Sequence, residues 1–312
     1  MIDVAPPACR SDVALAPLTY CKIGGRARIL CEAESEADVA AAIRWAHEKG
    51  VGLDDRFVLG GGANVLIDDR RDYGLVLTLD EGFNAIELSG DGRTARIEAG
   101  IYTPRLVREA SRRGWEGFQF LAGVPGTLGG AVVMNAGIRE LSTWDLVEAV
   151  EGIDWGGERR RVTREEAEPA YRSGGLPDDL VVTVVVCRIA PGDSDRIHGT
   201  ARELAGGRRE TQPLRHPSWG STFKNPSGTS SEGVTAGELI DRAGLKGFRV
   251  GDAQISEKHA NFVVNLGEAS AADALACIRR AHEEVLDRFG IALEPEVRLI
   301  GFPPEELEFL RR

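Results

Sequence analysis

The chain has 312 residues, of which 42% are hydrophobic, and its formal net charge is −11 at pH 7. This length allows two or three domains with cores of their own, and the acidic balance argues against nonspecific binding of nucleic acid. No apolar run approaches the length that crosses a bilayer and the N-terminus lacks the basic-then-apolar order of a signal peptide, so we expect a cytoplasmic protein without a membrane partner.

The first part of the chain mixes predicted helices with predicted strands. Ser35 begins a capping box, and apolar residues at helical spacing predict a helix over residues 36 to 49, ended by Gly50. Thr103 followed by proline predicts a second helix that stops at Gly114. Strands are predicted at 75–79, 95–99 and 180–189, with a hairpin turn at 155–158. The first two thirds therefore indicate an α+β fold.

A first glycine cluster lies inside the apolar run from Val58 to Ile67. An apolar segment enters Gly60, Gly61 and Gly62 and another leaves them, so the pattern predicts strand, loop, strand. A dinucleotide-binding turn would open a helix and a P-loop would end in Gly-Lys-Ser or Gly-Lys-Thr, so neither motif fits.

A second cluster, from Gly123 to Gly137, holds five glycines in fifteen residues. Such segments expose backbone N–H groups and allow close approach of a ligand, although tight turns in a sheet would explain either cluster alone. Two glycine loops flanked by apolar strands and about sixty residues apart favour a shared cofactor that carries a pyrophosphate.

A domain boundary is predicted in residues 190–210, where a polar turn occupies 190–195. Beyond it, Thr235 begins one helix and Ser270 begins a longer one that ends at Gly290. The stripe formed by Leu275, Ile278, Val285 and Phe289 is expected to be core. Between the helices, a polar cluster that starts at residue 251 runs into a strand that ends at 265.

The segment from Gly220 to Pro226 places a hydroxyl, an ammonium and a carboxamide in a stretch that a helix cannot enter. Ser221 could donate a proton there, and Lys224 and Asn225 could hold an anion such as a diphosphate. A surface loop is the alternative for this segment alone.

Five segments in order resemble the motifs of the UDP-N-acetylenolpyruvoylglucosamine reductase family, and the likeness runs from Thr19 to Gly301. The five segments are Leu59 to Asp69, Gly123 to Gly137, Gly220 to Pro226, Ala243 to Asn265, and Leu293 to Gly301. The resemblance implies an α+β protein with an FAD-binding fold of the vanillyl-alcohol oxidase (PCMH) type in two subdomains, plus a C-terminal α+β substrate domain. We expect an N-terminal extension over 1–18, the FAD-binding domain over 19–195 and the substrate-binding domain over 196–312.

The resemblance also implies the activity of a UDP-N-acetylmuramate dehydrogenase in peptidoglycan precursor synthesis. In this family NADPH reduces FAD, and the enolpyruvyl ether of a UDP-sugar then receives the hydride. The expected partners are this UDP-sugar and no nucleic acid or membrane, and we expect a monomer.

By resemblance, Ser221 donates the proton that completes the reduction, while Arg172 and Glu296 polarise the enolpyruvyl carboxylate and stabilise the intermediate. An ordinary surface arginine is the competing interpretation of Arg172, and a structural salt bridge is that of Glu296. The substrate is expected to contact Lys224, Asn225, His259 and Arg298. FAD is expected to contact residues of both glycine loops: Gly60, Gly61, Gly62, Ala63, Asn64, Val65, Gly123, Pro125, Gly126, Thr127, Gly129, Gly130, Asn135, Ala136 and Gly137.

The sequence predicts no metal site, and its five scattered cysteines indicate reduced structural thiols. The other four histidines (His47, His198, His216 and His282) are interpreted as ordinary residues.

Two stretches depart from the family pattern: Ser173 to Pro177 after the arginine, and Ile138-Arg139-Glu140 after the second glycine loop. Arg172 and Ser221 are separated by 48 residues without a tyrosine, as in the shorter branch that lacks a substrate-clamping loop. Two other classes stay open: a different flavoenzyme of the same fold, such as an oxidase, and a catalytically silent sugar-nucleotide binder.

Overall fold

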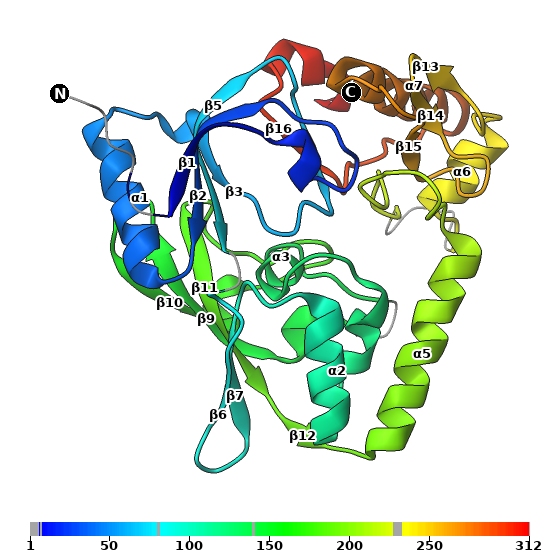
Figure 1. Ribbon diagram of the computed structural model, residues 1–312. Helices are drawn as coiled ribbons and strands as arrows, with labels where there is room; N and C mark the ends of the chain where they lie inside the picture. The colour runs from blue at the N-terminus through cyan, green and yellow to red at the C-terminus, as the bar shows by residue number, and fades with distance from the viewer. Residues whose placement is uncertain (1–5, 7, 80–81, 139–140, 227–232, 312) are drawn as a thin grey trace. The chain divides into compact units, whose positions relative to one another are not determined.

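The computed structural model describes residues 6, 8–79, 82–138, 141–226 and 233–311 (Figure 1). The chain divides into two compact units. The first unit comprises Met1–Val13, Ala27–Gly61 and Tyr73–Arg208, and the second comprises Ala14–Arg26, Gly62–Asp72 and Arg209–Arg312. Each unit is therefore assembled from three separate stretches of chain.

The first unit contains a four-stranded sheet in the order β1-β2-β5-β3, covered by helix α1. The strands are β1 (Cys9–Ala14), β2 (Arg26–Ala33), β5 (Asp72–Leu79) and β3 (Arg56–Val58), and the helix is α1 (Glu36–Glu48). The Ser35 side chain accepts from the Asp38 N–H and caps α1, as predicted. Buried Val39, Ile43 and Ala46 of the helix pack on Leu75 and its neighbours of the sheet.

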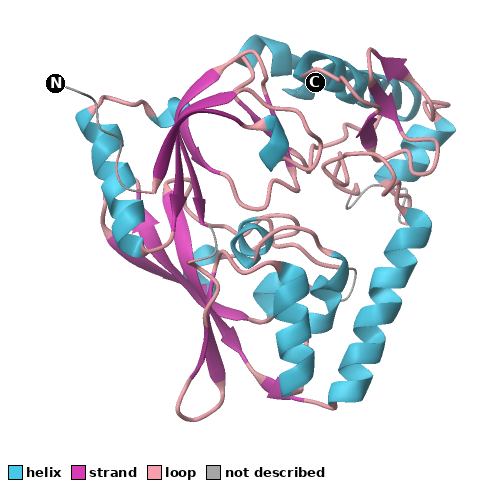
Figure 2. Ribbon diagram, viewed as in Figure 1, coloured by secondary structure: helices cyan, strands magenta, loops and turns pink. Residues whose placement is uncertain are grey.

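A five-stranded antiparallel sheet forms the other layer of the first unit, in the order β10-β9-β11-β7-β6 (Figure 2). Its strands are β6 (Ile86–Leu88), β7 (Thr94–Glu98), β9 (Val147–Asp154), β10 (Arg159–Thr163) and β11 (Leu180–Arg188). The predicted hairpin turn joins β9 to β10, where the Asp154 carboxylate accepts from the N–H groups of Gly156 and Glu158. The core of this layer includes fully buried Trp144.

Helices line one side of this core. They are α2 (Thr103–Arg113), η3 (Phe118–Gly123), α3 (Leu128–Val133), η4 (Thr143–Asp145) and α4 (Arg164–Ala167). The remaining elements of the first unit are η2 (Leu53–Asp55) and the short strand pair β8 (Trp115–Glu116) and β12 (Ala190–Pro191). The expectation that strands flank the second glycine loop is wrong: η3 precedes it and α3 lies within it. Thr127 explains the helix, because its hydroxyl accepts from the Gly130 N–H as an N-cap despite the low helix propensity of the glycines.

The second unit is built around helix α7 (Ala271–Phe289) and a three-stranded sheet, β13 (Arg249–Val250), β14 (Ala253–Ile255) and β15 (Val263–Asn265). Its other elements are η1 (Ala16–Leu18), α6 (Ala236–Arg242), η5 (Pro304–Arg311) and the parallel pair β4 (Val65–Ile67) and β16 (Arg298–Ile300). The predicted capping boxes at Thr235 and Ser270 are confirmed. The prediction that Phe289 belongs to the buried stripe is wrong. Its side chain is 38% exposed, because the last turn of α7 extends past the core that buries Ile278 and Val285.

Helix α5 (Ser194–Thr211) was not expected from the sequence. Only Ile197 and Ala201 of this helix are buried, and Ala201 and Leu204 join the core of the first unit. For this reason the compact units divide within α5, after Arg208. The sequence predicted a boundary within residues 190–210, and the expected domains were 19–195 and 196–312.

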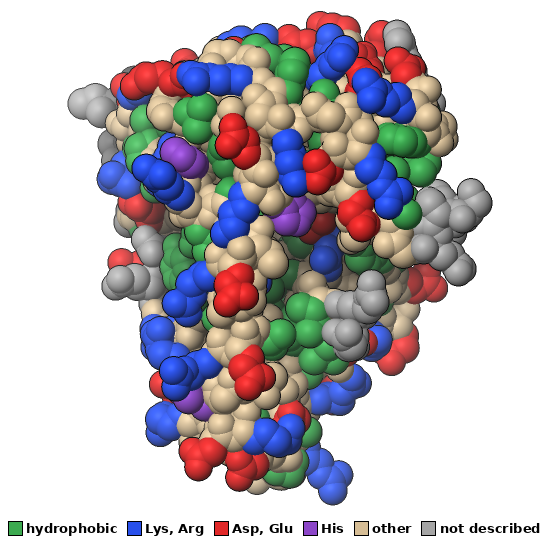
Figure 3. Space-filling model, turned by 90° about the vertical axis from the view of Figure 1, so that its right-hand side faces the viewer, with side chains coloured by type: hydrophobic (Ala, Val, Ile, Leu, Met, Phe, Trp, Pro, Cys, Tyr) green, Lys and Arg blue, Asp and Glu red, His purple; other side chains and the backbone are tan. Residues whose placement is uncertain are grey.

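Acidic and basic side chains are interspersed over the face of the molecule drawn in Figure 3. No helix within the described residues is long and apolar enough to cross a membrane.

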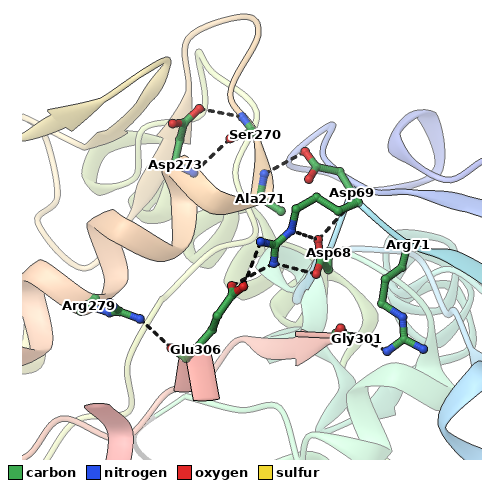
Figure 4. Close-up of polar contacts among 10 residues, drawn as sticks. Asp68, Asp69, Arg71, Ser270, Ala271, Asp273, Arg279, Gly301 and Glu306 are labelled. Atoms are coloured by element: carbon green, nitrogen blue, oxygen red, sulfur yellow. Dashed lines mark hydrogen bonds and ion pairs between the residues drawn. The ribbon is translucent and has the colours of Figure 1, made fainter. Parts of the chain in front are cut away.

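A polar network ties four consecutive residues, 68–71, to distant parts of the second unit (Figure 4). Buried Asp68 accepts from Arg70, and Arg70 also makes a bidentate pair with Glu306 of η5. Asp69 accepts from the Ala271 N–H at the start of α7, and Arg71 donates to the Gly301 carbonyl. The segment that follows β4 therefore holds the C-terminal elements of the same unit in place.

Candidate active site

The two glycine loops meet in the first unit. A Cβ added to Gly61 would lie 2.6 Å from the Gly126 Cα, and one added to Gly60 would lie 3.2 Å from the Thr127 Oγ1. Real Cβ atoms essentially never approach backbone as closely as 2.6 Å, so glycine is required at position 61. The sequence prediction that both loops serve one ligand has a geometric basis in this contact.

The second loop is fixed by bonds to the segment before α2. The Thr103 N–H donates to the Gly126 carbonyl at 3.0 Å, and the Gly129 N–H donates to the Ala99 carbonyl at 2.8 Å. Leu128 and Gly130 also donate their N–H groups within the protein. The first turn of α3 therefore has few backbone N–H groups for a ligand.

Other backbone donors of the two loops remain available. Within the described residues, the N–H groups of Gly60, Gly61, Gly126 and Thr127 donate to no protein group. Gly60 is exposed, and so is Gly130, where an added Cβ would meet only the Thr127 hydroxyl at 3.6 Å. Backbone N–H groups that donate to no protein acceptor fit the pyrophosphate of a dinucleotide such as FAD.

Asn135 to Gly137 connect this loop to the predicted catalytic arginine. The Asn135 amide donates to the Ala170 carbonyl and accepts from the Trp144 N–H, so this side chain is used to hold the protein together. The Gly137 carbonyl accepts from the Arg172 guanidinium at 3.1 Å. The orientation of the Asn135 side chain is therefore fixed by the protein.

Arg172 lies in a tight turn with φ of 57°, and its guanidinium is 4.9 Å from the centre of the Tyr171 ring. It lines a cavity of about 290 Å³ in the first unit together with Asn135, Ser142 and Arg164. A left-handed backbone at a non-glycine residue is uncommon and is found where the surroundings impose it.

The stretch that departs from the family pattern after Arg172 has a packing reason. A Cβ at Gly174 would lie 2.4 Å from the Val132 carbonyl oxygen, and one at Gly175 would lie 1.6 Å from that of Ala167. The two glycines let the arginine turn pack closely on α3 and α4. Of the other departure, Ile138 is exposed, whereas Arg139 and Glu140 lie outside the described residues.

In the second unit, the Ser221 segment pairs with the Glu296 segment. The Glu296 N–H donates to the Thr222 carbonyl at 2.8 Å, and the Lys224 N–H donates to the Glu294 carbonyl at 2.8 Å. Ser221 and Glu296 are both half-buried. Two motifs that are far apart in the sequence are thus held side by side by backbone hydrogen bonds, around an antiparallel bridge between Phe223 and Pro295.

The predicted substrate residues lie around the same segment. Lys224 forms an ion pair with Glu294, and the Asn225 carboxamide accepts from the Ala236 N–H at the start of α6. His259 lies against the same turn, since a Cβ on Gly237 would be 3.1 Å from its Cε1. Asn225 and His259 therefore meet on the first turn of α6.

Burial lowers the pKa of His259, with a smaller contribution from the Lys246 charge. The Asn261 N–H donates to His259 Nδ1 at 3.3 Å, so the neutral ring carries its proton on Nε2. The histidine can thus act as a neutral hydrogen-bond donor.

The end of the first glycine loop belongs to the second unit. Gly62 has φ of 64°, and a Cβ there would lie 2.2 Å from the Leu18 carbonyl oxygen. Ala63 follows, and the Asn64 carboxamide donates to the Glu296 carbonyl at 3.0 Å while the Asn64 carbonyl accepts from the Arg298 N–H. Val65 and Arg298 are paired residues of β4 and β16.

The predicted residues thus form two groups. One, in the first unit, comprises Gly60, Gly61, the second glycine loop and Arg172. The other, in the second unit, comprises the end of the first loop from Gly62 on and the residues around Ser221 and Glu296. Sequence reasoning missed Asn261, whose side chain bonds the backbone of Phe223 on both sides. Its position inside the fourth motif segment was the available signal.

Family matches agree with this division. Residues 27–163 match the family described as "FAD binding domain", which defines a flavoprotein and confirms the predicted cofactor and fold class. Residues 212–300 match "UDP-N-acetylenolpyruvoylglucosamine reductase, C-terminal domain".

Whole-chain relatives extend the match. A UDP-N-acetylenolpyruvoylglucosamine reductase of Anaeromyxobacter sp. (strain Fw109-5) is 45% identical over 96% of this chain and 91% of its own length. One from Symbiobacterium thermophilum is 41% identical over 96% of both chains. The crystal structure of the corresponding reductase from Thermus caldophilus is 36% identical, covers 93% of this chain and 99% of its own, and superposes with a TM-score of 0.78. The chain belongs to the UDP-N-acetylenolpyruvoylglucosamine reductase family, as its motifs indicated.

Proposed function

We propose that this chain reduces the enolpyruvyl group of UDP-N-acetylglucosamine enolpyruvate to give UDP-N-acetylmuramate, with FAD as cofactor and NADPH as reductant, in peptidoglycan precursor synthesis. The observation that carries the residue roles is the backbone pairing of the Ser221 segment with the Glu296 segment. It supports a hydroxyl and a carboxyl acting in one reaction.

The chemistry sets clear demands. An enol ether is electron-rich and resists hydride addition, so the site must draw charge toward the enolpyruvyl carboxylate and stabilise the enolate-like intermediate of the substrate. FAD held by the glycine loops would supply hydride transfer, from NADPH to one carbon of the enolpyruvyl group. The protein must then deliver a proton to the neighbouring carbon, which completes the addition of two hydrogens across the double bond.

In this proposal Ser221 donates the proton, and Glu296 and Arg172 stabilise the charge that develops on the substrate. A serine is a weak acid but the enolate is a strong base, so an oriented and partly buried hydroxyl can serve. The Arg172 turn supports its role, because close packing fixes the backbone in a left-handed conformation and the Gly137 carbonyl binds the guanidinium.

The substrate contacts follow from the first turn of α6. Asn225 and His259 both touch this turn, and a neutral His259 can donate from Nε2 to a phosphate oxygen of the UDP group. Lys224 and Arg298 contribute positive charge in the same unit. The backbone N–H groups of Gly60, Gly61, Gly126 and Thr127, which donate to no described protein group, would hold the pyrophosphate of FAD.

The purified protein tests the proposal and its two alternatives. We expect a yellow protein with a flavin absorbance spectrum and NADPH consumption that depends on the enolpyruvyl sugar. A flavoprotein that consumes oxygen instead of this substrate would be an oxidase of the same fold. A protein that binds the sugar nucleotide without consuming NADPH would be a silent binder.

The variant Ser221→Ala tests the proton donor. Flavin reduction by NADPH should keep its wild-type rate, because this step needs no proton on the sugar, while turnover of the enolpyruvyl sugar should fall by at least about 100-fold. Rapid mixing measures both steps from the flavin absorbance. Full turnover in the variant would show that Ser221 is not the donor.

We further propose that the enzyme works as a monomer in the cytoplasm, where NADPH and UDP-sugars are found, and that it has no nucleic-acid partner. The net charge of −11 supports the last point, because polyanions are repelled. Sedimentation should give a mass near 33.6 kDa at micromolar concentration, and twice that mass would contradict the monomer.

A further inference from the structure

We infer that Asn261 is a positioning residue for Ser221, holding the serine segment in register with Glu296. The inference rests on the proposed role of Ser221 as proton donor. Asn261 lies in the loop between β14 and β15 and is 4% exposed.

Asn261 binds the two residues after Ser221 through three hydrogen bonds. Its backbone carbonyl accepts from the Thr222 N–H at 2.7 Å. Its side-chain oxygen accepts from the Phe223 N–H at 2.9 Å, and its side-chain nitrogen donates to the Phe223 carbonyl at 2.8 Å. The carboxamide therefore binds both the N–H and the carbonyl of Phe223, as a neighbouring strand would.

The opposite side of the same segment faces the Glu296 segment. The Thr222 carbonyl accepts from the Glu296 N–H at 2.8 Å and from the Val297 N–H at 3.3 Å. Residues 222 and 223 thus lie between Asn261 on one side and Glu296 on the other. Without the Asn261 carboxamide, this side of the segment loses both hydrogen bonds to Phe223 and keeps only the backbone bond to Thr222.

Ser221 lies between Gly220 and the segment that the asparagine binds. Gly220 has φ of 89°, and a Cβ added to it would meet nothing within 4 Å. Trp219 before it is 2% exposed, and Thr222 and Phe223 after the serine are each 1% exposed. The backbone at Ser221 is therefore held by buried residues on both sides, and the asparagine fixes the C-terminal side.

Asn261 is itself held in place. Its own N–H donates to His259 Nδ1, and the His259 ring contacts the Phe262 ring with centroids 4.9 Å apart. A buried carboxamide with both ends bonded has one orientation. It can therefore transmit a fixed geometry to Ser221.

A positioning role predicts an effect on one half of the reaction. Proton delivery requires Ser221, whereas reduction of the flavin by NADPH does not. In Asn261→Ala we expect flavin reduction to stay within about twofold of wild type, and reoxidation by the enolpyruvyl sugar to slow by at least about tenfold, since displacements of about 1 Å can cost up to about 100-fold.

The experiment compares Asn261→Ala with Asn265→Ala by rapid mixing of the FAD-loaded protein, first with NADPH and then with the enolpyruvyl sugar. Asn265 is the matched control: it is also 4% exposed, and its carboxamide makes three hydrogen bonds to backbone groups, of Cys21, Gly267 and Ala269, where that of Asn261 makes two. Asn261→Asp is the second variant, because it keeps the shape and the acceptor for Phe223 but loses the donor.

A double-mutant cycle with Ser221→Ala completes the test. If Asn261 acts through Ser221, adding Asn261→Ala to Ser221→Ala should slow reoxidation no further. Equal slowing by the Asn261 and Asn265 variants, or full additivity with Ser221→Ala, would overturn the inference. Failure of both Asn261 variants to fold while Asn265→Ala folds would make Asn261 a structural residue and overturn it as well.

The same data separate this inference from the proposed function. Normal reoxidation in Ser221→Ala would contradict the proposed proton donor. Slow reoxidation in Ser221→Ala with normal reoxidation in both Asn261 variants would contradict only the positioning role.

Discussion

The contact between the glycine loops makes Gly61 a sensitive residue. In Gly61→Ala the new Cβ would lie 2.6 Å from the Gly126 Cα and 3.2 Å from its carbonyl carbon, so backbone has to move. We expect destabilisation by about 1–3 kcal/mol and partial loss of bound FAD, measured by urea unfolding and by the ratio of flavin to protein absorbance. Gly90→Ala is the control, since nothing lies within 4 Å of its Cβ. Equal flavin content in the two variants would contradict the role given to the contact.

His259 gives a pH dependence whose sign is fixed by its environment. Burial lowers its pKa below the ordinary value of 6.5, so the unfolded chain binds the proton more readily. Its contribution to stability is present above pH 6.5 and is lost as the pH falls from 6.5 through the folded pKa. Relative to His259→Gln, the wild-type free energy of unfolding should therefore drop between pH 7 and pH 5. Urea unfolding at several pH values measures this, with His198→Gln at an exposed position as the control; parallel curves for wild type and His259→Gln would contradict it.

At the level of elements, the segment after β4 governs acid stability of the second unit. Burial raises the pKa of Asp68, but hydrogen bonds and charge from Arg70 lower it by more, so the pKa lies below its ordinary value of 3.8. The stabilisation is present above pH 3.8 and is lost as the pH falls through the folded pKa. Arg70 also binds η5 through Glu306, so the effect reaches a second element.

Asp68→Asn should flatten the decline in stability below pH 4 and cost about 1–3 kcal/mol at pH 7, because a charged acceptor of a partly exposed arginine is lost. Urea unfolding from pH 7 to pH 3 measures both effects. Asp287→Asn, at an exposed position of α7, is the control. If the free energy of unfolding declined below pH 4 in Asp68→Asn as it does in wild type, the network would not be the cause of that decline.

The sequence predicted elements well where local signals were strong. Ser35, Thr235 and Ser270 cap their helices as expected. A serine or threonine just before apolar residues at helical spacing can accept a hydrogen bond from an N–H of the first turn. The sequence did not predict α5. This helix buries only Ile197 and Ala201 and contains glycines at 199, 206 and 207, so neither apolar spacing nor helix propensity indicates it.

The sequence pointed to candidate reacting groups but not to their support. The residues around Ser221 suggested a proton donor, and the family resemblance added Glu296. Asn261 did not stand out, since its role depends on backbone groups of Phe223, which carry no trace in the sequence. For the same reason Asn64 was expected only as a cofactor residue, although its carboxamide bonds the Glu296 carbonyl.

For the whole molecule, the interlaced units predict that the chain cannot be cut at the boundary expected from the sequence. A fragment of residues 196–312 lacks Ala14–Arg26 and Gly62–Asp72, which belong to the second unit. It would lose β4, the strand partner of β16, and the Asp69 bond to the start of α7.

We expect this fragment to unfold without cooperativity, whereas the full chain shows a sigmoidal urea transition. Circular dichroism in the near ultraviolet measures the difference. Co-expression with residues 1–195 should restore ordered structure, because it returns the missing strand. A fragment that unfolds cooperatively by itself would show that residues 14–26 and 62–72 are dispensable.

The pairing of Asn64 with Glu296 joins residues 232 positions apart and has a consequence for biosynthesis. At roughly 5–20 residues per second, a ribosome needs on the order of tens of seconds to make the intervening chain. During that time β4 has been synthesised but its partner has not, so the second unit cannot mature from the N-terminus onward. The nascent protein must carry an unpaired strand until translation is almost complete, and this interval is when chaperones would matter most to it.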